Sequence, residues 1–265
     1  MMRLTIFMCV LFFAVSGYAG TESGQSCLRV ALIQAHLQWG DVDGNLKAFG
    51  ERVEKCDGVD LIVFPELFAS GCEMKKGNGD KKAEIAACYE NIRVKLGEWA
   101  AKKKAVVMGS TIYAENGQFF NRLIVAFPDG KYSYYDKHNC FKKGAFSPGE
   151  NQLFIEYKGF KIATYICYDL RFPEWSRNSV GYDVAVYVAN WPASRREDWQ
   201  RLLQERAQEN KAYVIGVNCA GSDPNGLYYA GDSGVVDPDG KWISRCEEGK
   251  DQIEIVNVYL RQVEG

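Results

Sequence analysis

The feature that most constrains the fold is a series of short, almost wholly apolar runs separated by segments of helical spacing. The runs have the length of β-strands, and they occupy residues 28–34, 60–64, 105–110, 161–166, 183–189 and 212–218. Between them, apolar residues recur at intervals of three and four in segments 42–55, 84–103 and 195–210. Strands buried on both faces and alternating with helices are typical of α/β proteins. The sequence therefore predicts an α/β layered fold.

Hairpin patterns accompany these runs. Residues 118–127 and 131–136 flank a Pro-Asp-Gly turn, and 154–157 and 161–166 flank a Lys-Gly turn. Such pairs predict antiparallel hairpins, so the sheet is expected to be mixed. We expect a short helix to begin after Pro173, because proline is favoured in a first helical turn. Two further strands, 233–236 and 252–258, are expected to close the sheet.

The N-terminal segment has the pattern of a signal peptide. Arg3 precedes an apolar run over 4–15, and small residues follow up to Ala19. We interpret 1–19 as a leader that directs export, to a periplasm or the exterior, and 20–265 as a single domain. If the start codon is misassigned, the protein would instead be cytoplasmic.

Composition limits the classes of partner. The net charge is −2 with both signs interspersed, whereas a nucleic-acid or membrane partner would favour a basic stripe or tail. The chain has two histidines and no C-x-x-C pair, so no metal site is expected. Its nine cysteines are widely spaced, and several lie in or beside apolar runs. We therefore expect buried thiols rather than a disulfide framework.

Three reactive residue types stand where predicted strands end. Glu66 follows the run 61–64, Lys137 follows 132–136, and Cys167 follows 162–166. Taken singly, each has an ordinary explanation: a solvated glutamate, a surface lysine and one more buried cysteine. Taken together, a base, a cation and a thiol at strand ends can converge at one edge of a sheet.

Together, these three residue types can supply each step of hydrolysis through a covalent thioester. Glu66 would take the proton of the Cys167 thiol and later return it to a departing amine. The Lys137 ammonium and the backbone N–H of Tyr168 would stabilise the oxyanion of a tetrahedral intermediate, where one donor is typically worth ~3 kcal/mol. The expected outcome is a thioester that water then hydrolyses.

The segments around these residues resemble the Glu, Lys and Cys motifs of the nitrilase (carbon-nitrogen hydrolase) superfamily. The matching segments are Pro-Glu-Leu-Phe at 65–68, Tyr-Asp-Lys-His at 135–138 and Ile-Cys-Tyr-Asp-Leu-Arg-Phe-Pro-Glu-Trp at 166–175. Flanking segments at 189–192, 205–210 and 231–233 also match, in the same order. The resemblance extends from about residue 28 to the C-terminus.

The Cys-Tyr-Asp-x-Arg-Phe-Pro form and Asn190-Trp191-Pro192 are similar to the omega-amidase branch, whose members hydrolyse monoamides of short dicarboxylic acids such as 2-oxoglutaramate. The resemblance implies a four-layer α-β-β-α sandwich, a homodimer and no cofactor. A substrate carboxylate would need a cationic partner, for which Arg171 is the first candidate and Arg195 the second. A structural salt bridge is an equally good explanation for each. Asn190 and Trp191 are expected to contact substrate.

One loop departs from the family pattern. Related amidases carry a second glutamate between the lysine and a later Pro-Gly turn, but residues 138–149 contain no carboxylate and Glu150 lies past the turn. This departure leaves two alternatives open. The chain could be another amidase or a carbamoylase of the same superfamily, or a secreted binding protein that keeps the fold without turnover.

Overall fold

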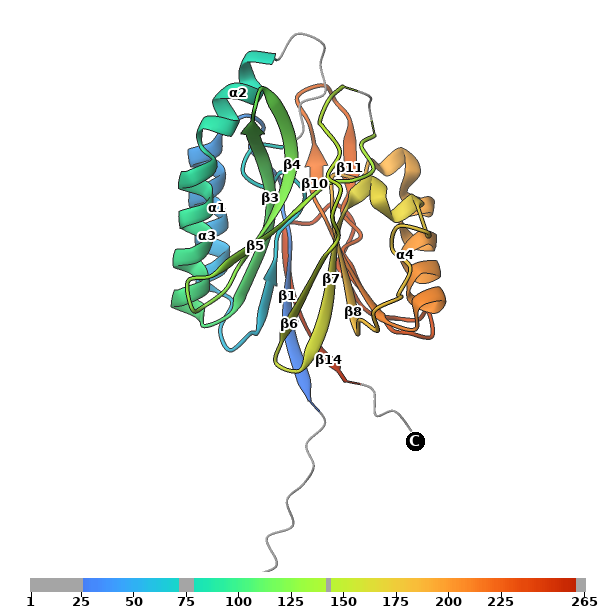
Figure 1. Cartoon of the computed structure of the whole chain (residues 1–265). Helices are drawn as coiled ribbons and strands as arrows, with labels where there is room; N and C mark the ends of the chain where they lie inside the picture. Colours follow the sequence, from blue (N-terminus) through green and yellow to red (C-terminus); the bar gives the residue numbers. More distant parts are fainter. Residues whose placement is uncertain (1–25, 72–78, 142–143, 261–265) are drawn as a thin grey trace, which may run out of the picture.

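The computed structural model describes residues 26–71, 79–141 and 144–260. Two six-stranded sheets pack face to face (Figure 1). Helices α1 (Val42–Glu54) and α3 (Tyr89–Lys103) lie outside one sheet, and α4 (Arg196–Asn210) lies outside the other. This arrangement is the expected α-β-β-α sandwich with mixed sheets. The predicted leader, 1–19, lies outside the described residues. Within the described ranges, no helix has the length and apolar character needed to cross a membrane.

The first sheet has the strand order β14-β1-β2-β3-β4-β5. Its strands are β1 (Cys27–Gln34), β2 (Leu61–Val63), β3 (Val106–Glu115), β4 (Gln118–Ala126), β5 (Tyr132–Asp136) and β14 (Gln252–Tyr259). β1, β2 and β3 are parallel, whereas β4, β5 and β14 join through antiparallel pairs. The last strand of the chain therefore lies beside the first.

The second sheet has the order β13-β12-β9-β8-β7-β6. Its strands are β6 (Leu153–Tyr157), β7 (Phe160–Ile166), β8 (Val184–Ala189), β9 (Tyr213–Asn218), β12 (Gly234–Val236) and β13 (Trp242–Arg245). β7, β8 and β9 are parallel. A separate hairpin of β10 (Ala220–Ser222) and β11 (Tyr228–Ala230) follows β9.

Burial on both faces explains the apolar runs. In β1, Val30 and Leu32 belong to the core cluster that also contains residues of the second sheet, while Ala31 and Ile33 belong to the cluster under the outer helices. Alternate side chains of a strand point to opposite faces, and here neither face meets water. These strands therefore show no alternation of apolar and polar residues in the sequence.

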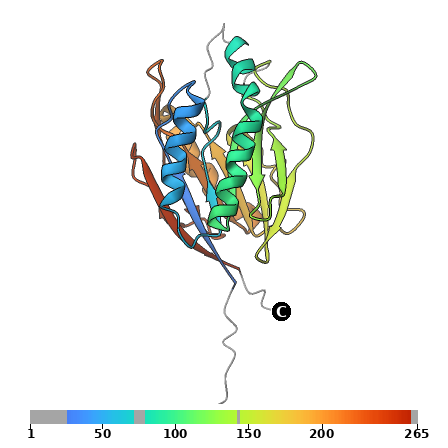
Figure 2. The same cartoon turned by 90° about the vertical axis from the view of Figure 1, so that its left-hand side faces the viewer.

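The predicted helix over 84–103 is wrong in extent, because the structure has two helices here. α2 (Gly79–Ala87) and α3 (Tyr89–Lys103) are separated at Cys88, whose N–H donates to the Ile85 carbonyl three residues earlier at 3.0 Å. That tighter turn interrupts the α-helical pattern. α3 and α1 (Val42–Glu54) lie side by side on the outer face of the first sheet (Figure 2).

The short helix expected after Pro173 is also wrong, since residues 173–176 form only turns. A 3₁₀ helix, η1 (Cys167–Arg171), begins instead at the cysteine. The Asp169 carboxylate accepts the Ile166 N–H at 3.0 Å, which caps this helix before the proline is reached. Farther along the chain, η2 (Ala193–Arg195) leads into α4 (Arg196–Asn210).

Candidate active site

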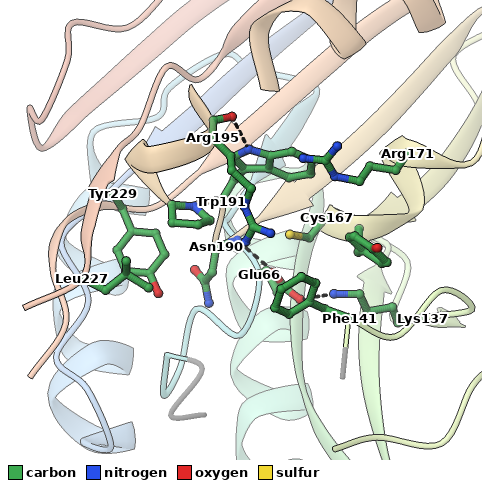
Figure 3. A pocket seen from close by; sticks show the side chains of 12 residues that line it. Glu66, Lys137, Phe141, Cys167, Arg171, Asn190, Trp191, Arg195, Leu227 and Tyr229 are labelled. Carbon is green, nitrogen blue, oxygen red and sulfur yellow. Dashed lines mark hydrogen bonds and ion pairs between the residues drawn. The ribbon is translucent and has the colours of Figure 1, made fainter. Parts of the chain in front are cut away.

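Glu66, Lys137 and Cys167 converge in one pocket (Figure 3). Glu66 and Lys137 lie just beyond β2 and β5 of the first sheet, and Cys167 just beyond β7 of the second. All three are buried, and the Lys137 Nζ is 2.7 Å from the Glu66 Oε1. The pocket therefore lies where the two sheets meet.

Three N–H donors hold the Glu66 carboxylate. Asn121 Nδ2 and Lys137 Nζ donate to Oε1, each at 2.7 Å, and the backbone N–H of Asn190 donates to Oε2 at 2.8 Å. Asn121 lies on β4 and Asn190 follows β8, so the base is fixed from both sheets. Charge-assisted bonds of this kind are short and directional.

Lys137 is held at its backbone as well as at its amine. Its N–H donates to the Asn121 carbonyl at 2.9 Å, and its carbonyl accepts the Gly149 N–H at 3.0 Å. Burial opposes a charged amine, but the Glu66 carboxylate and Cys167 outweigh it and raise the pKa of Lys137 above its usual value. Lys137 is therefore an ammonium ion at neutral pH.

Cys167 has an unusual backbone conformation. Its φ of +46° lies in the left-handed region, which costs ~1–3 kcal/mol for a residue with a Cβ. The Asp169 carboxylate supports this turn, because it accepts the Ile166 N–H and the Asn139 N–H, the latter at 2.8 Å, and the Tyr135 hydroxyl at 2.7 Å. The turn carries the sulfur at the end of β7 into the pocket.

The charge state of the thiol follows from its neighbours. Burial raises the pKa of the Cys167 thiol well above its usual range, and the Glu66 carboxylate raises it further, while Lys137 lowers it. The resting sulfur is therefore protonated, and a base must accept its proton before it can attack. The Glu66 carboxylate hydrogen-bonds the thiol and so lies within reach of its proton.

The remaining wall combines aromatic side chains with two arginines. The additional lining residues are Phe141, Tyr168, Arg171, Asn190, Trp191, Pro192, Arg195, Leu227 and Tyr229. All of the residues expected to contact substrate are thus placed in this pocket. The two arginines differ, since Arg171 pairs with Asp198 at 2.6 Å whereas Arg195 lies over the Phe141 ring.

The comparisons with known proteins agree with this geometry. The profile of the family described as carbon-nitrogen hydrolase matches residues 29–265. The chain belongs to this family. The carbon-nitrogen hydrolase fold is also shared with a superfamily member from Xanthomonas campestris, XC1258, at a TM-score of 0.82, 34% identity, and coverage of 88% of this chain and 90% of that one.

Curated relatives of this carbon-nitrogen hydrolase include amidases. The omega-amidase YafV of Escherichia coli K12 is 38% identical over 83% of this chain and 85% of its own length. The 2-oxoglutaramate amidase of Bacillus subtilis 168 is 32% identical over 85% and 90%, respectively. Saccharomyces cerevisiae Nit3, of branch 10 of the nitrilase superfamily, aligns at a TM-score of 0.78 and 25% identity, covering 88% of this chain and 90% of that one.

The two ends of the loop that differs from the family pattern lie together. His138 Nδ1 lies 2.7 Å from the Gly149 carbonyl, and its ring stacks on Trp175 with centroids 3.6 Å apart. Glu150 is exposed and does not line the pocket. Among the described lining residues, Glu66 is therefore the only carboxylate.

Several supporting residues of the carbon-nitrogen hydrolase site were not predicted. Asn121 holds Glu66, and Asp169 and Tyr135 hold the Cys167 turn. Asn218 accepts the Trp191 N–H at 2.7 Å and so positions the Asn190–Trp191 segment. The available signal was a polar residue beside an apolar run: Asn121 lies in β4 shortly before its apolar end, and Asn218 is the last residue of β9.

The expectation of buried thiols is confirmed at Cys56, Cys167 and Cys246, whereas Cys27, Cys88 and Cys140 are only partly buried. Free thiols occur at Cys27, Cys56, Cys88, Cys140, Cys167 and Cys246. Burial raises the pKa of Cys56 to about 11 and that of Cys246 to about 12, so both stay protonated at neutral pH. They behave as small apolar side chains.

Proposed function

We propose that this carbon-nitrogen hydrolase is an omega-amidase-like enzyme that releases ammonia from the terminal amide of a small dicarboxylic acid monoamide. The observation that carries the proposal is the meeting of Glu66, Lys137 and Cys167 in one buried pocket, with the Lys137–Glu66 contact at 2.7 Å. A base, a cation and a thiol at one point are the requirements for thiol-dependent acyl transfer.

In the first half of the reaction, Glu66 accepts the thiol proton as the sulfur attacks the amide carbon. The carbonyl oxygen becomes an oxyanion, which the Lys137 ammonium and the Tyr168 backbone N–H stabilise. Glu66 then returns its proton to the amide nitrogen. The C–N bond breaks, ammonia leaves, and a thioester to Cys167 remains.

In the second half, water takes the place of ammonia. Glu66 removes a proton from this water as its oxygen attacks the thioester carbon, and the same two donors stabilise the second oxyanion. The C–S bond then breaks, and the thiolate recovers its proton from Glu66. One amide and one water yield one carboxylic acid and one ammonia, with the enzyme restored.

The identity of the substrate rests on the relatives and the pocket. Relatives at 32% and 38% identity carry the names 2-oxoglutaramate amidase and omega-amidase. The pocket adds Arg171 and Arg195 as candidate partners of a substrate carboxylate, with Asn190 and Trp191 as further contacts. The proposed chemistry uses no cofactor, because thiol, carboxylate and ammonium supply every proton transfer. The expected homodimer stays a prediction.

Replacing Cys167 with Ala tests the proposal. Ammonia release from 2-oxoglutaramate should fall by at least about 1000-fold, because the nucleophile of the covalent step is lost. Circular dichroism and the thermal midpoint should stay near those of the parent protein. Activity that persists in the folded variant would overturn the assignment of Cys167.

A panel of amides separates the alternatives. Monoamides of dicarboxylic acids, simple aliphatic amides and N-carbamoyl compounds would be compared by ammonia release. Preference for the monoamides supports the proposal, and preference for N-carbamoyl compounds would make the chain a carbamoylase. No turnover of any compound would favour the binding protein.

A further inference from the structure

Two arginines line the pocket, and Arg171 already has partners. Its Nη2 donates to the Asp198 carboxylate at 2.6 Å, and its guanidinium carbon lies 4.8 Å from the centre of the Trp191 ring. The Arg171 side chain lowers the pKa of Asp198, as expected for two opposite charges in direct contact. To bind a substrate carboxylate, Arg171 would have to share or lose this ion pair.

Arg195 has no such partner. Its guanidinium carbon lies 4.7 Å from the centre of the Phe141 ring, and within the described ranges the guanidinium makes no ion pair. Its backbone is fixed, because the Trp191 Nε1 donates to the Arg195 carbonyl at 2.7 Å. In Figure 3 the Arg195 side chain runs from η2 into the pocket.

The pocket has an excess of positive charge at Arg195. Lys137 is balanced by Glu66 and Arg171 by Asp198. Of the described charged side chains that line the pocket, only Arg195 is uncompensated. An unpaired guanidinium beside apolar rings favours an anionic group, with which it can form two parallel hydrogen bonds.

Asn190 supplies a second, independent observation. The residue is only 9% exposed, and its side-chain Nδ2 and Oδ1 are both buried without a hydrogen-bond partner among the described residues. A buried unpaired amide costs ~1–3 kcal/mol, so a polar ligand group is expected beside it. Its backbone N–H is used by Glu66, which leaves the side chain as the part available to substrate.

We propose that Arg195 and Asn190 together bind the end of the substrate opposite the scissile amide. Arg195 binds the carboxylate, and the Asn190 amide donates to an oxo oxygen on the adjacent carbon. Arg171 is a positioning residue, which holds Trp191 through the contact described above and does not bind the carboxylate. This assignment rests on the proposed function and names the residues that bind the far end of its substrate.

Three substrates that share one amide end test the assignment. 2-Oxoglutaramate has both the oxo group and the carboxylate, glutaramate has only the carboxylate, and butyramide has neither. Replacing Arg195 with Met should lower kcat/KM for the two carboxylates by about 10- to 100-fold, the usual range for a charge-assisted pair. Turnover of butyramide should stay within about threefold of the parent, since no carboxylate is lost.

The other two variants separate the roles. Asn190→Ala should lower kcat/KM for 2-oxoglutaramate by about 5- to 30-fold and change glutaramate much less, because one buried hydrogen bond is lost. Arg171→Met is the matched control, and it should affect all three substrates to a similar degree. Circular dichroism and thermal midpoints would establish that each variant is folded.

Direct binding gives a readout that does not depend on turnover. In the Cys167→Ala background, calorimetry with 2-oxoglutaramate should show the same weakening for Arg195→Met as kcat/KM does. Equal losses on butyramide, or a carboxylate-selective loss in Arg171→Met, would overturn the assignment while leaving the amidase intact. A parent protein that turns over none of the three substrates would overturn the proposed function itself.

Discussion

At the scale of single residues, Glu66 has two opposing effects on Cys167. It is placed to accept the thiol proton, yet its negative charge also raises the pKa of the thiol, which Lys137 lowers. Replacing Glu66 with Gln removes the base and leaves Lys137 as the dominant charge beside the sulfur. The two effects can therefore be separated by experiment.

For Glu66→Gln we expect faster alkylation of Cys167 at neutral pH and loss of amide hydrolysis. The pKa of the thiol should fall, so the thiolate fraction at pH 7 should rise, and iodoacetamide should react at least about fivefold faster. Ammonia release should fall by about 1000-fold, because no group accepts the proton in either half-reaction. Slower labelling in the folded variant would contradict the electrostatic argument.

That Glu66, Lys137 and Cys167 lie together could be predicted from sequence because each stands at the end of a predicted strand. What could not be predicted is which neighbours hold them. The bond from Asn121 to Glu66 joins residues 55 positions apart, and the bond from Arg171 to Asp198 joins residues 27 positions apart. Both depend on three-dimensional proximity between elements that carry no local signal for it. The sequence alone ranked Arg171 above Arg195 as the partner of a substrate carboxylate, because it does not show that Arg171 pairs with Asp198.

At the scale of elements, most strands buried on both faces were predicted well, but β3 continues to Glu115, past the predicted end at 110, and the helix interruption was missed. Residues 84–103 have continuous helical spacing, so nothing in the pattern indicates the tighter turn at Cys88. The hairpin β10–β11 was also missed, because its strands have only three residues each. Strands 233–236 and 252–258 were expected to close one sheet, but β12 lies in the second sheet and β14 pairs with β1 in the first, because such pairing depends on long-range register.

The connection between β5 and the Pro-Gly turn gives a test at this scale. A Cβ added at Gly149 would lie 2.2 Å from the Asp136 carbonyl oxygen, next to Lys137. Gly149→Ala should lower the free energy of unfolding by about 2 kcal/mol and reduce ammonia release, because the end of β5 must move. Thermal melts and steady-state rates would measure both effects.

Gly50 in α1 is the matched control. A Cβ there would meet the Trp99 ring at 3.5 Å, an ordinary contact, and its φ is helical. Gly50→Ala should raise the free energy of unfolding by about 0.5–1 kcal/mol, since alanine loses less backbone entropy in a helix. A stable, fully active Gly149→Ala would contradict the proposed crowding.

At the scale of the whole molecule, the reactive groups are divided between two sheets. Glu66 and Lys137 follow strands of the first sheet, whereas Cys167 and Asn190 follow strands of the second. The 2.8 Å bond from the Asn190 N–H to Glu66 joins the two sides directly. The proposed catalysis therefore requires the two sheets to keep their relative position. The strands and helices of each sheet can persist without it.

We expect activity to be lost at lower urea concentrations than secondary structure. A displacement of about 1 Å between base and nucleophile is enough to cost about 100-fold in rate, while far-ultraviolet circular dichroism reports only the strands and helices. The two transitions would be followed in the same samples, with substrate saturating. Coincident curves would contradict this expectation and indicate a single cooperative transition.

The pairing of β1 with β14 joins residues at opposite ends of the chain, Cys27 with Tyr259 and Gln34 with Gln252. During synthesis β1 is made before β14, and more than 200 residues separate each pair of partners in these two strands. Meanwhile, its hydrogen-bonding edge is available to other chains. The outer edge of β1 therefore stays uncovered until β14 has been made and pairs with it.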